Sequence, residues 1–145
     1  MTASPLPQRP TVLLVDDDAA TNYYNQRLVQ RMQVSPEVLV ASNADDALAV
    51  LNTRCAHPGT AACPTLILLD FNMPLLNGFE FLRAFTQRHP ALPQSFVVVL
   101  LTALPLDPDL VQAQHLPVTA LLTKPLTAEA VNCLLNNYFG VPVST

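Results

Sequence analysis

The sequence predicts an α/β fold in which five parallel strands alternate with five helices. Short and almost uninterrupted apolar runs occur five times, at residues 12–15, 37–41, 66–69, 96–101 and 118–122. Such runs are typical of strands that are buried on both faces of a parallel sheet. Segments with apolar residues three or four apart separate the runs, and this spacing indicates helices that cover the sheet through right-handed crossovers.

The helical spacing occurs at residues 19–33, 44–53, 78–88, 107–115 and 128–139. In the first of these segments, Tyr24, Leu28 and Met32 lie four residues apart and predict a buried stripe. Of the adjacent tyrosines Tyr23 and Tyr24, we therefore expect one in the core and one at the surface. The last segment has a helix-capping residue, Thr127, directly before it and a glycine directly after it.

The length of 145 residues fits one domain. Residues 1–10 contain three prolines, and we expect them to form a flexible arm. We place the folded domain at residues 11–140 and a short tail at residues 141–145. The longest apolar run has six residues, from 96 to 101, and is far too short to span a membrane.

Composition and charge argue against several classes of protein. The formal net charge is −4 and the seven Lys and Arg residues are scattered, which argues against a nucleic-acid-binding face. The first residues lack the apolar core of a signal peptide. The three cysteines, Cys55, Cys63 and Cys133, are odd in number and form no CxxC pair, so we expect no disulfide framework. A cytoplasmic protein without a membrane or nucleic-acid partner is the simplest interpretation.

Polar side chains lie at or just after the ends of four of the apolar runs. They are the aspartates Asp16–Asp18 after the first run, Asp70 after the third, Thr102 after the fourth and Lys124 near the end of the fifth. Because ligands of a parallel sheet bind outside the carboxyl ends of its strands, we expect these groups to converge. Converging carboxylates repel one another and call for a cation, and oxygen ligands suit Mg²⁺.

These groups together are suited to phosphoryl transfer. A carboxylate is able to act as a nucleophile and form an aspartyl phosphate. Lys124 would neutralise phosphoryl oxygens as a point charge, and the Thr102 hydroxyl would donate a hydrogen bond to one of them. Taken singly, each residue fits a turn, a helix cap or a solvated side chain equally well. Their common position at one edge of the predicted sheet is what indicates a phosphoryl-binding site.

The motifs at these positions resemble the receiver domain of bacterial response regulators, including single-domain regulators of the chemotaxis type. The matching stretches are Val12–Asp18, Leu66–Pro74 followed by Asn77-Gly78, Leu101–Ala103 and Thr123–Pro125. The resemblance extends over residues 11–140. It implies a flavodoxin-like (βα)5 fold with a doubly wound, five-stranded parallel sheet in the order 2-1-3-4-5. It also implies a stand-alone receiver that is no enzyme beyond catalysing its own phosphorylation and dephosphorylation.

The resemblance implies where the phosphoryl group and the metal ion bind. Asp70 would accept the phosphoryl group from a phosphohistidine of a sensor histidine kinase or a histidine phosphotransfer protein. Asp16, Asp17 and Asp70 would hold Mg²⁺ together with the backbone carbonyl of Asn72, with Asp17 as a direct ligand. Asp18 would cap the first helix.

The resemblance also implies the parts that respond to phosphorylation. Thr102, Ala103 and Lys124 would contact the phosphoryl group, and the bond between Lys124 and Pro125 would be a cis peptide. The family usually has Tyr or Phe three residues before the lysine, where this chain has Leu121. A rotating aromatic ring therefore cannot be the switch at that position. The surface that would face an output partner is atypical, so the downstream protein target is not implied, and a homodimer stays open.

One further expectation concerns the lifetime of the phosphorylated state. In the family, the residues two positions after the phosphorylated aspartate and two after the threonine set the access of hydrolytic water. Here they are Asn72 and Leu104. An apolar Leu104 does not orient water, so we expect slow self-dephosphorylation.

Two other functions stay open from the sequence alone. A degenerate receiver would bind partners without ever being phosphorylated, and Leu121 is the residue that keeps this alternative open. A small phosphatase of the haloacid dehalogenase class would use an aspartate after the first strand as its nucleophile. That class has a hydroxyl or branched residue where this chain has Ala20, and it would leave Asp70 without a role.

Overall fold

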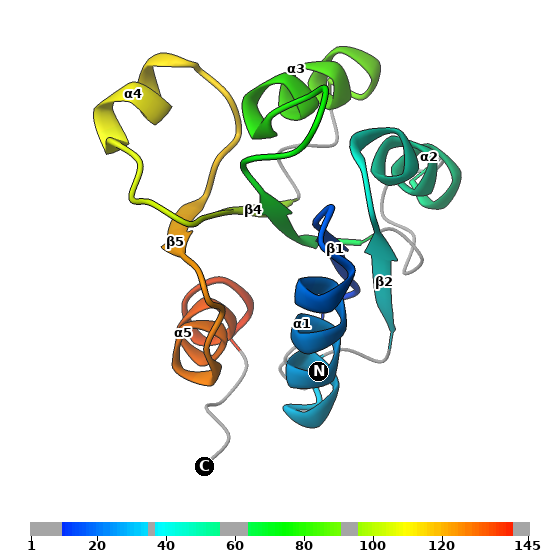
Figure 1. Ribbon diagram of the computed structural model, residues 1–145, viewed down its shortest axis with the longest axis vertical. Coiled ribbons are helices and arrows are strands. Elements are labelled where there is room, and N and C mark those ends of the chain that lie inside the picture. Colours follow the sequence, from blue (N-terminus) through cyan, green and yellow to red (C-terminus); the bar gives the residue numbers. More distant parts are fainter. Residues whose placement is uncertain (1–9, 35–36, 56–63, 91–95, 141–145) are drawn as a thin grey trace, which may run out of the picture.

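The computed structural model describes residues 10–34, 37–55, 64–90 and 96–140, and in them five parallel strands form one sheet in the order β2-β1-β3-β4-β5. Each strand is followed by a helix (Figure 1), which confirms the predicted fold class and strand order. Apart from residue 10, the arm predicted at residues 1–10 and the tail at 141–145 lie outside the described residues.

The element boundaries lie within a few residues of those that the sequence predicts. The strands are β1 (Val12–Val15), β2 (Val38–Ala41), β3 (Leu66–Asp70), β4 (Val97–Thr102) and β5 (Ala120–Thr123). The helices are α1 (Ala19–Arg31), α2 (Ala44–Arg54), α3 (Gly78–Arg88), α4 (Pro108–Ala113) and α5 (Ala128–Phe139).

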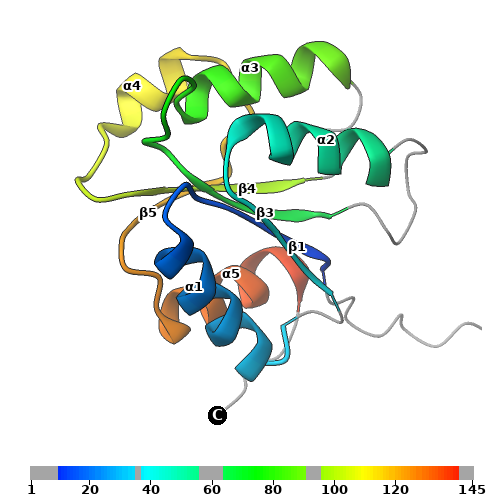
Figure 2. The same ribbon diagram turned by 45° about the vertical axis from the view of Figure 1, so that its right-hand side comes forward.

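The sheet is the middle of three layers, with α1 and α5 on one face and α2, α3 and α4 on the other (Figure 2). Side chains alternate between the two faces along each strand. In β1, Leu13 packs toward α2 and α3 while Leu14 packs toward α1 and α5. Both side chains are at most 1% exposed. The sheet therefore contributes to two hydrophobic cores at once, as its continuous apolar runs predict.

The expectation that all five strands are buried on both faces is wrong for the two outer ones. Strands β1, β3 and β4 are almost fully buried, whereas most residues of β2 and β5 are partly exposed. Val40 of β2 is 40% exposed. The reason is position, since β2 and β5 form the edges of the sheet and have a neighbouring strand on one side only.

The buried stripe of α1 differs from the prediction. Tyr23 and Tyr24 are both exposed, at 62% and 49%, so neither is in the core. The positions that face the sheet are instead Asn22 and Asn25, which are 5% and 4% exposed, followed by Leu28. The start of α1 lies over the end of the sheet, where backbone carbonyls need hydrogen-bond donors, and this requirement overrides the apolar pattern.

The caps of α1 and α5 agree with those that the sequence predicts, and α3 has a further one. Asp18 caps α1, where its carboxylate accepts a hydrogen bond from the Ala20 N–H. Thr127 caps α5, and Gly140 ends that helix with a φ of +64°, a conformation that glycine adopts without strain. Asn77 and Glu80 form a capping box at the start of α3.

One expectation about the cysteines is wrong. Cys55, buried at the end of α2, is disulfide-bonded, and its partner lies outside the described residues. An odd total of cysteines leaves room for one pair, and Cys133 is a free thiol. Among the described residues, no helix is both long and apolar enough to cross a membrane.

The aromatic cluster beneath α3 gives a test of the core. The Phe85 side chain is fully buried. The centroid of its ring lies 5.2 Å from the ring centroid of Phe96 and 6.5 Å from that of Phe81. We expect Phe85→Ala to lower the free energy of unfolding by about 3–5 kcal/mol, because it removes buried contacts and leaves a cavity. Urea denaturation measures this loss. Phe85→Leu serves as the control and should cost clearly less, and an equal cost would contradict the cavity argument.

Candidate phosphoryl and metal site

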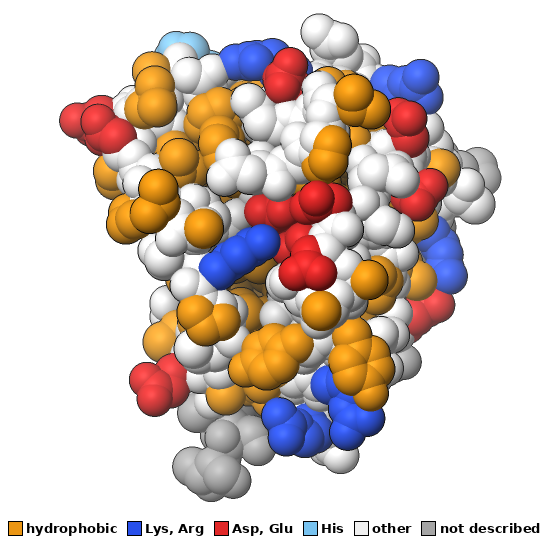
Figure 3. Space-filling model, viewed as in Figure 1, with side chains coloured by type: hydrophobic (Ala, Val, Ile, Leu, Met, Phe, Trp, Pro, Cys, Tyr) orange, Lys and Arg blue, Asp and Glu red, His pale blue; other side chains and the backbone are white. Residues whose placement is uncertain are grey.

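The predicted site residues come together at the carboxyl edge of the sheet. Strand register places Asp70, the last residue of β3, beside Leu101, and Thr102, the last residue of β4, beside Thr123. The turn between β1 and α1 brings Asp16 and Asp17 to the same edge. On this face of the molecule acidic side chains gather at the centre, with a basic side chain beside them (Figure 3).

Three carboxylates form the acidic cluster of this edge, namely those of Asp16, Asp17 and Asp70. One oxygen from each lies within 4.8 Å of the others. Asp16 and Asp70 are buried, at 2% and 4% exposure, whereas Asp17 is exposed to solvent. The cluster is therefore held by the fold at two positions and open to solvent at the third.

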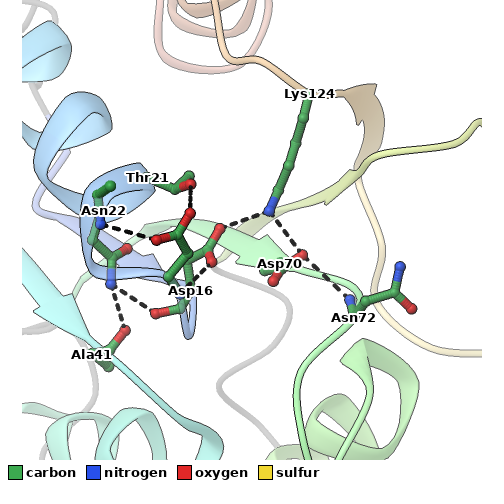
Figure 4. Close-up of polar contacts among 9 residues, drawn as sticks. Asp16, Thr21, Asn22, Ala41, Asp70, Asn72 and Lys124 are labelled. Carbon is green, nitrogen blue, oxygen red and sulfur yellow. Dashed lines mark hydrogen bonds and ion pairs between the residues drawn. The ribbon is translucent and has the colours of Figure 1, made fainter.

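Lys124 connects the two buried carboxylates (Figure 4). Its Nζ lies 2.8 Å from Asp16 Oδ2 and 3.2 Å from Asp70 Oδ1. Burial alone lowers the pKa of the Lys124 ammonium, but the hydrogen bonds and charges of Asp16 and Asp70 outweigh it and raise the pKa. Lys124 is thus a permanent cation at neutral pH.

Asp70 is destabilised as an anion despite this ion pair. Burial is the main cause and the negative charge of Asp16 adds to it, so that the pKa of Asp70 is raised to about 6. The hydrogen bond and charge of Lys124 and the backbone N–H of Asn72, 3.3 Å from Asp70 Oδ1, act in the opposite direction but only partly offset it. Since a pKa of about 6 is still below 7, Asp70 is mostly ionised at neutral pH. A further cation nearby would stabilise this anion.

The acidic turn is held by hydrogen bonds on both sides. The Asp18 N–H donates to Asp16 Oδ1 at 2.9 Å. The carboxylate of Asp18 accepts from the Thr21 hydroxyl at 2.8 Å, which together with the Ala20 N–H lowers the pKa of Asp18. Asp18 therefore serves the start of α1 as its N-cap.

Asn22 is a site residue that reading the sequence missed. Its side-chain amide donates to the carbonyl oxygens of Asp16, at 2.8 Å, and of Ala41, at 3.2 Å. A signal was available in the sequence, because Asn22, Asn25 and Leu28 are three residues apart and share one helical face. The apolar spacing of Tyr24, Leu28 and Met32 instead indicated a different buried face.

Thr102 is buried at the correct edge, but its hydroxyl is engaged elsewhere. The hydroxyl donates a hydrogen bond to the backbone carbonyl of Leu104 and accepts one from the Leu104 N–H at 3.1 Å. The intervening Ala103 is exposed. A hydroxyl has a single proton to donate, so Thr102 must release the Leu104 carbonyl before it donates to any other oxygen.

The predicted switch position lies apart from the acidic cluster. Leu121 in β5 is half-buried and packs against the core that α2, α3 and α4 cover. It also lines a groove of about 600 Å³ between α4 and β5, together with Val111 and Leu116.

The peptide bond between Lys124 and Pro125 is cis, as the family resemblance implies.

The residues of the acidic cluster fit a magnesium ion. Their donor atoms are all oxygens, which is the set that Mg²⁺ prefers, and their spacing allows one ion to bridge them. Lys124 is the one cation that the described residues bring into contact with Asp16 and Asp70, so three carboxylates face a single ammonium group. The exposed Asp17 leaves room for the water ligands that Mg²⁺ retains.

Comparisons with known proteins agree with this geometry. The model of the response regulator receiver domain family matches residues 12–135. Response regulator Rcp1 of Synechocystis is 32% identical over 113 residues, which are 78% of this chain and 75% of Rcp1. A two component response regulator from Cytophaga hutchinsonii is 31% identical and superposes with a TM-score of 0.78 over 92% of this chain and 100% of its own.

Two further matches extend the range of relatives. The chemotaxis protein CheY4 of Vibrio cholerae is 25% identical, with a TM-score of 0.69 over 89% of this chain and 98% of its own. The autoinducer 1 sensor kinase/phosphatase LuxN of Vibrio harveyi is 28% identical over 133 residues, which are 92% of this chain but 14% of LuxN.

The chain belongs to the response regulator receiver family. It is a receiver domain of two-component signalling, which makes it a signalling module rather than a classical enzyme. Receiver domains bind Mg²⁺ in an acidic pocket and interact with sensor histidine kinases or phosphotransfer proteins, and this chain has a cluster of three aspartates, Asp16, Asp17 and Asp70, at the carboxyl edge of its sheet.

The raised pKa of Asp70 predicts how this carboxyl affects stability in metal-free buffer. The folded carboxyl binds its proton more tightly than the unfolded one, so the unfolded chain loses the proton first as pH rises from about 4 to 6. The free energy of unfolding therefore falls across this window. We expect Asp70→Asn to be more stable than the wild type by about 2 kcal/mol at pH 7.5 and by almost nothing at pH 3.5.

Urea denaturation in the presence of a chelator measures both values. Asp17→Asn is the control, since Asp17 belongs to the same cluster but is exposed, and it should gain less than half as much. A wild type that is more stable than Asp70→Asn at pH 7.5 would contradict the argument, because it would mean that the Lys124 ion pair outweighs burial.

Proposed function

We propose that Asp70 accepts a phosphoryl group from a phosphohistidine of a sensor histidine kinase or a histidine phosphotransfer protein, and that Mg²⁺ is required. The phosphorylated protein then signals through a protein–protein interaction that depends on phosphorylation. The observation that supports this most directly is the position of Lys124 Nζ, 2.8 Å from Asp16 and 3.2 Å from Asp70. A cation is thereby held beside the carboxylate that would be phosphorylated.

In this proposal, a carboxylate oxygen of Asp70 attacks the phosphorus atom while the bond to the histidine nitrogen breaks. The Asn72 N–H, 3.3 Å from Asp70 Oδ1, would orient the attacking carboxylate. Lys124 would shift its contact from the carboxylates to a phosphoryl oxygen. Mg²⁺ held by Asp16, Asp17, Asp70 and the Asn72 carbonyl would neutralise charge on the phosphoryl oxygens.

The signal would start at Thr102. A phosphoryl oxygen on Asp70 would compete with the Leu104 carbonyl for the one proton of the Thr102 hydroxyl. The loop that begins at Ala103 would then lose one of the two hydrogen bonds that join Leu104 to the Thr102 hydroxyl. Leu121 lines the groove beside α4, and as an aliphatic side chain it would repack there instead of rotating as a ring.

The remaining parts of the proposal concern organisation and partners. The domain would span residues 11–140 and act as a stand-alone receiver, either as an intermediate of a phosphorelay or by binding a downstream protein target. A second copy of the chain is a further partner to consider. Because the loop after Thr102 and the groove at Leu121 would change with phosphorylation, the partner surface should include them.

Intact mass measurement tests the central step. We expect acetyl phosphate with Mg²⁺ to add the mass of one phosphoryl group to the wild-type protein. Asp70→Asn should show no gain, because its amide is not a nucleophile. Lys124→Gln should be phosphorylated at least about tenfold more slowly, because it removes the cation beside the developing charge.

The alternatives give different results in the same experiment. A wild-type protein that gains no mass, although it is folded and Mg²⁺ is present, would support a degenerate receiver. Turnover of a phosphomonoester that is lost in Asp16→Asn but kept in Asp70→Asn would support the phosphatase alternative. A mass gain that persists in Asp70→Asn would place the phosphoryl group on another residue.

A second prediction concerns the lifetime of the phosphorylated state. The Leu104 side chain is 76% exposed, so it is free to be replaced without loss of core packing. We expect the wild type to lose phosphate slowly and Leu104→Glu to lose it about tenfold faster, because a carboxylate orients the attacking water. The decay of the phosphorylated mass over time gives both rates.

The control for this comparison is Leu104→Ala, which removes the apolar side chain without adding a polar group. It should keep the slow rate of the wild type, since the backbone bonds between Leu104 and Thr102 are unaffected. The explanation is wrong if the wild type decays within seconds and Leu104→Glu is no faster.

A further inference from the structure

We propose that Asn22 is a positioning residue that holds the acidic turn between β1 and α1 in the arrangement that binds Mg²⁺. This inference rests on the proposed function, because it concerns the same metal site. Asn22 lies in the second turn of α1, is 5% exposed and makes no contact with Asp70 or Lys124 among the described hydrogen bonds. It would therefore act through Asp16.

The contacts of Asn22 join the ends of two strands. Its Nδ2 donates one hydrogen bond to the Asp16 carbonyl, at 2.8 Å, and one to the Ala41 carbonyl, at 3.2 Å (Figure 4). The last paired residues of β1 and β2 are Val15 and Ala41, so the Asp16 carbonyl lies just beyond the ladder. A buried carbonyl there needs a donor from outside the sheet, and a side-chain amide nitrogen carries two N–H groups for two carbonyls.

The peptide group that contains the Asp16 carbonyl also controls the direction of the metal-binding side chains. The carbonyl of Asp16 belongs to the peptide bond that leads into Asp17, so fixing it fixes the backbone between the two carboxylates. The Asp16 N–H donates to the Ala41 carbonyl at 3.2 Å, and the Asp18 N–H donates to Asp16 Oδ1 at 2.9 Å. Without the Asn22 amide, the peptide would be free to rotate, and the oxygens of Asp16 and Asp17 would no longer be held near Asp70.

A second observation concerns the side-chain oxygen of Asn22. Its Oδ1 is buried, and within the described parts of the chain it has no hydrogen-bond partner. An unsatisfied buried oxygen is costly, whereas leucine has a similar size and no such atom. Such a local cost is tolerated at positions that serve a function, which agrees with a role of the Asn22 amide in ordering the turn.

Asn25 offers a matched control. It is also an asparagine on the buried face of α1, it is 4% exposed, and it lies one turn further from the acidic cluster. Its side chain lines a mostly apolar groove with Tyr24 and Leu126, to which Lys124 also contributes. None of the hydrogen bonds described for Asp16 involves Asn25, so replacing Asn25 tests the loss of a buried amide on α1 without removing a contact of the turn at Asp16.

The experiment compares Asn22→Leu and Asn25→Leu with the wild type by titrating the unphosphorylated protein with Mg²⁺ alone in a calorimeter. We expect Asn22→Leu to weaken Mg²⁺ binding about tenfold and Asn25→Leu to leave the affinity within about twofold. In phosphorylation by acetyl phosphate, Asn22→Leu should raise the Mg²⁺ concentration for half-maximal rate by the same factor. The rate at saturating Mg²⁺ should stay near the wild-type value.

A purely structural role would change the melting temperature of Asn22→Leu and leave its Mg²⁺ affinity unchanged, and this result would overturn the inference. If circular dichroism shows that Asn22→Leu does not fold, Asn22→Ser takes its place under the same criterion, since it keeps at most one donor. A wild type that binds no Mg²⁺ also overturns the inference. A wild type that binds Mg²⁺ but is not phosphorylated overturns the proposed function and leaves the role of Asn22 standing.

Discussion

The burial of two carboxylates next to each other, balanced by one ammonium group, is the constraint on which the site depends. Asp16 and Asp70 are almost inaccessible to solvent, and Lys124 is the cation that contacts both. The balance is incomplete, because the pKa of Asp70 is still raised to about 6. The folded chain therefore keeps an unfavourable charge at the edge of its sheet, and a divalent cation or a bound phosphoryl group with its metal would relieve it.

Keeping these charges in place requires support from the backbone around them. The parallel register of β1, β3 and β4 brings the strand ends together, and the turn after β1 is tied to the end of β2 through Asn22. Asp18 anchors the same turn to α1 as its N-cap. The start of α1 is accordingly polar on the face where a covering helix is usually apolar, so this helix combines a packing role with the support of the site.

At the ends of β4 and β5, the carboxyl edge of the sheet is arranged differently. The Thr102 hydroxyl is engaged with the backbone of Leu104, which links the end of β4 to an exposed apolar loop. Because one hydroxyl proton serves one acceptor at a time, a hydrogen bond from Thr102 to a phosphoryl oxygen, as proposed above, would replace its bond to the Leu104 carbonyl. Leu121 lies beside a groove next to α4, so a change in the loop has space into which nearby aliphatic side chains are able to repack.

Much of this protein is determined by its sequence, because the relevant signals are local. Continuous apolar runs identify the strands, and polar residues at their ends identify Asp16, Asp70, Thr102 and Lys124, since all parallel strands end at one edge. Helix caps such as Asp18 and Thr127 depend on adjacent residues and are equally predictable.

Only the tertiary structure decided the features that depend on residues far apart in the chain. It exposed Tyr23 and Tyr24 and buried Asn22, because the Asp16 and Ala41 carbonyls need donors that no helical periodicity records. It left β2 and β5 half-exposed, because strand order makes them edges. It also raised the pKa of Asp70, since burial and the distance to Asp16 exist only once the chain has folded.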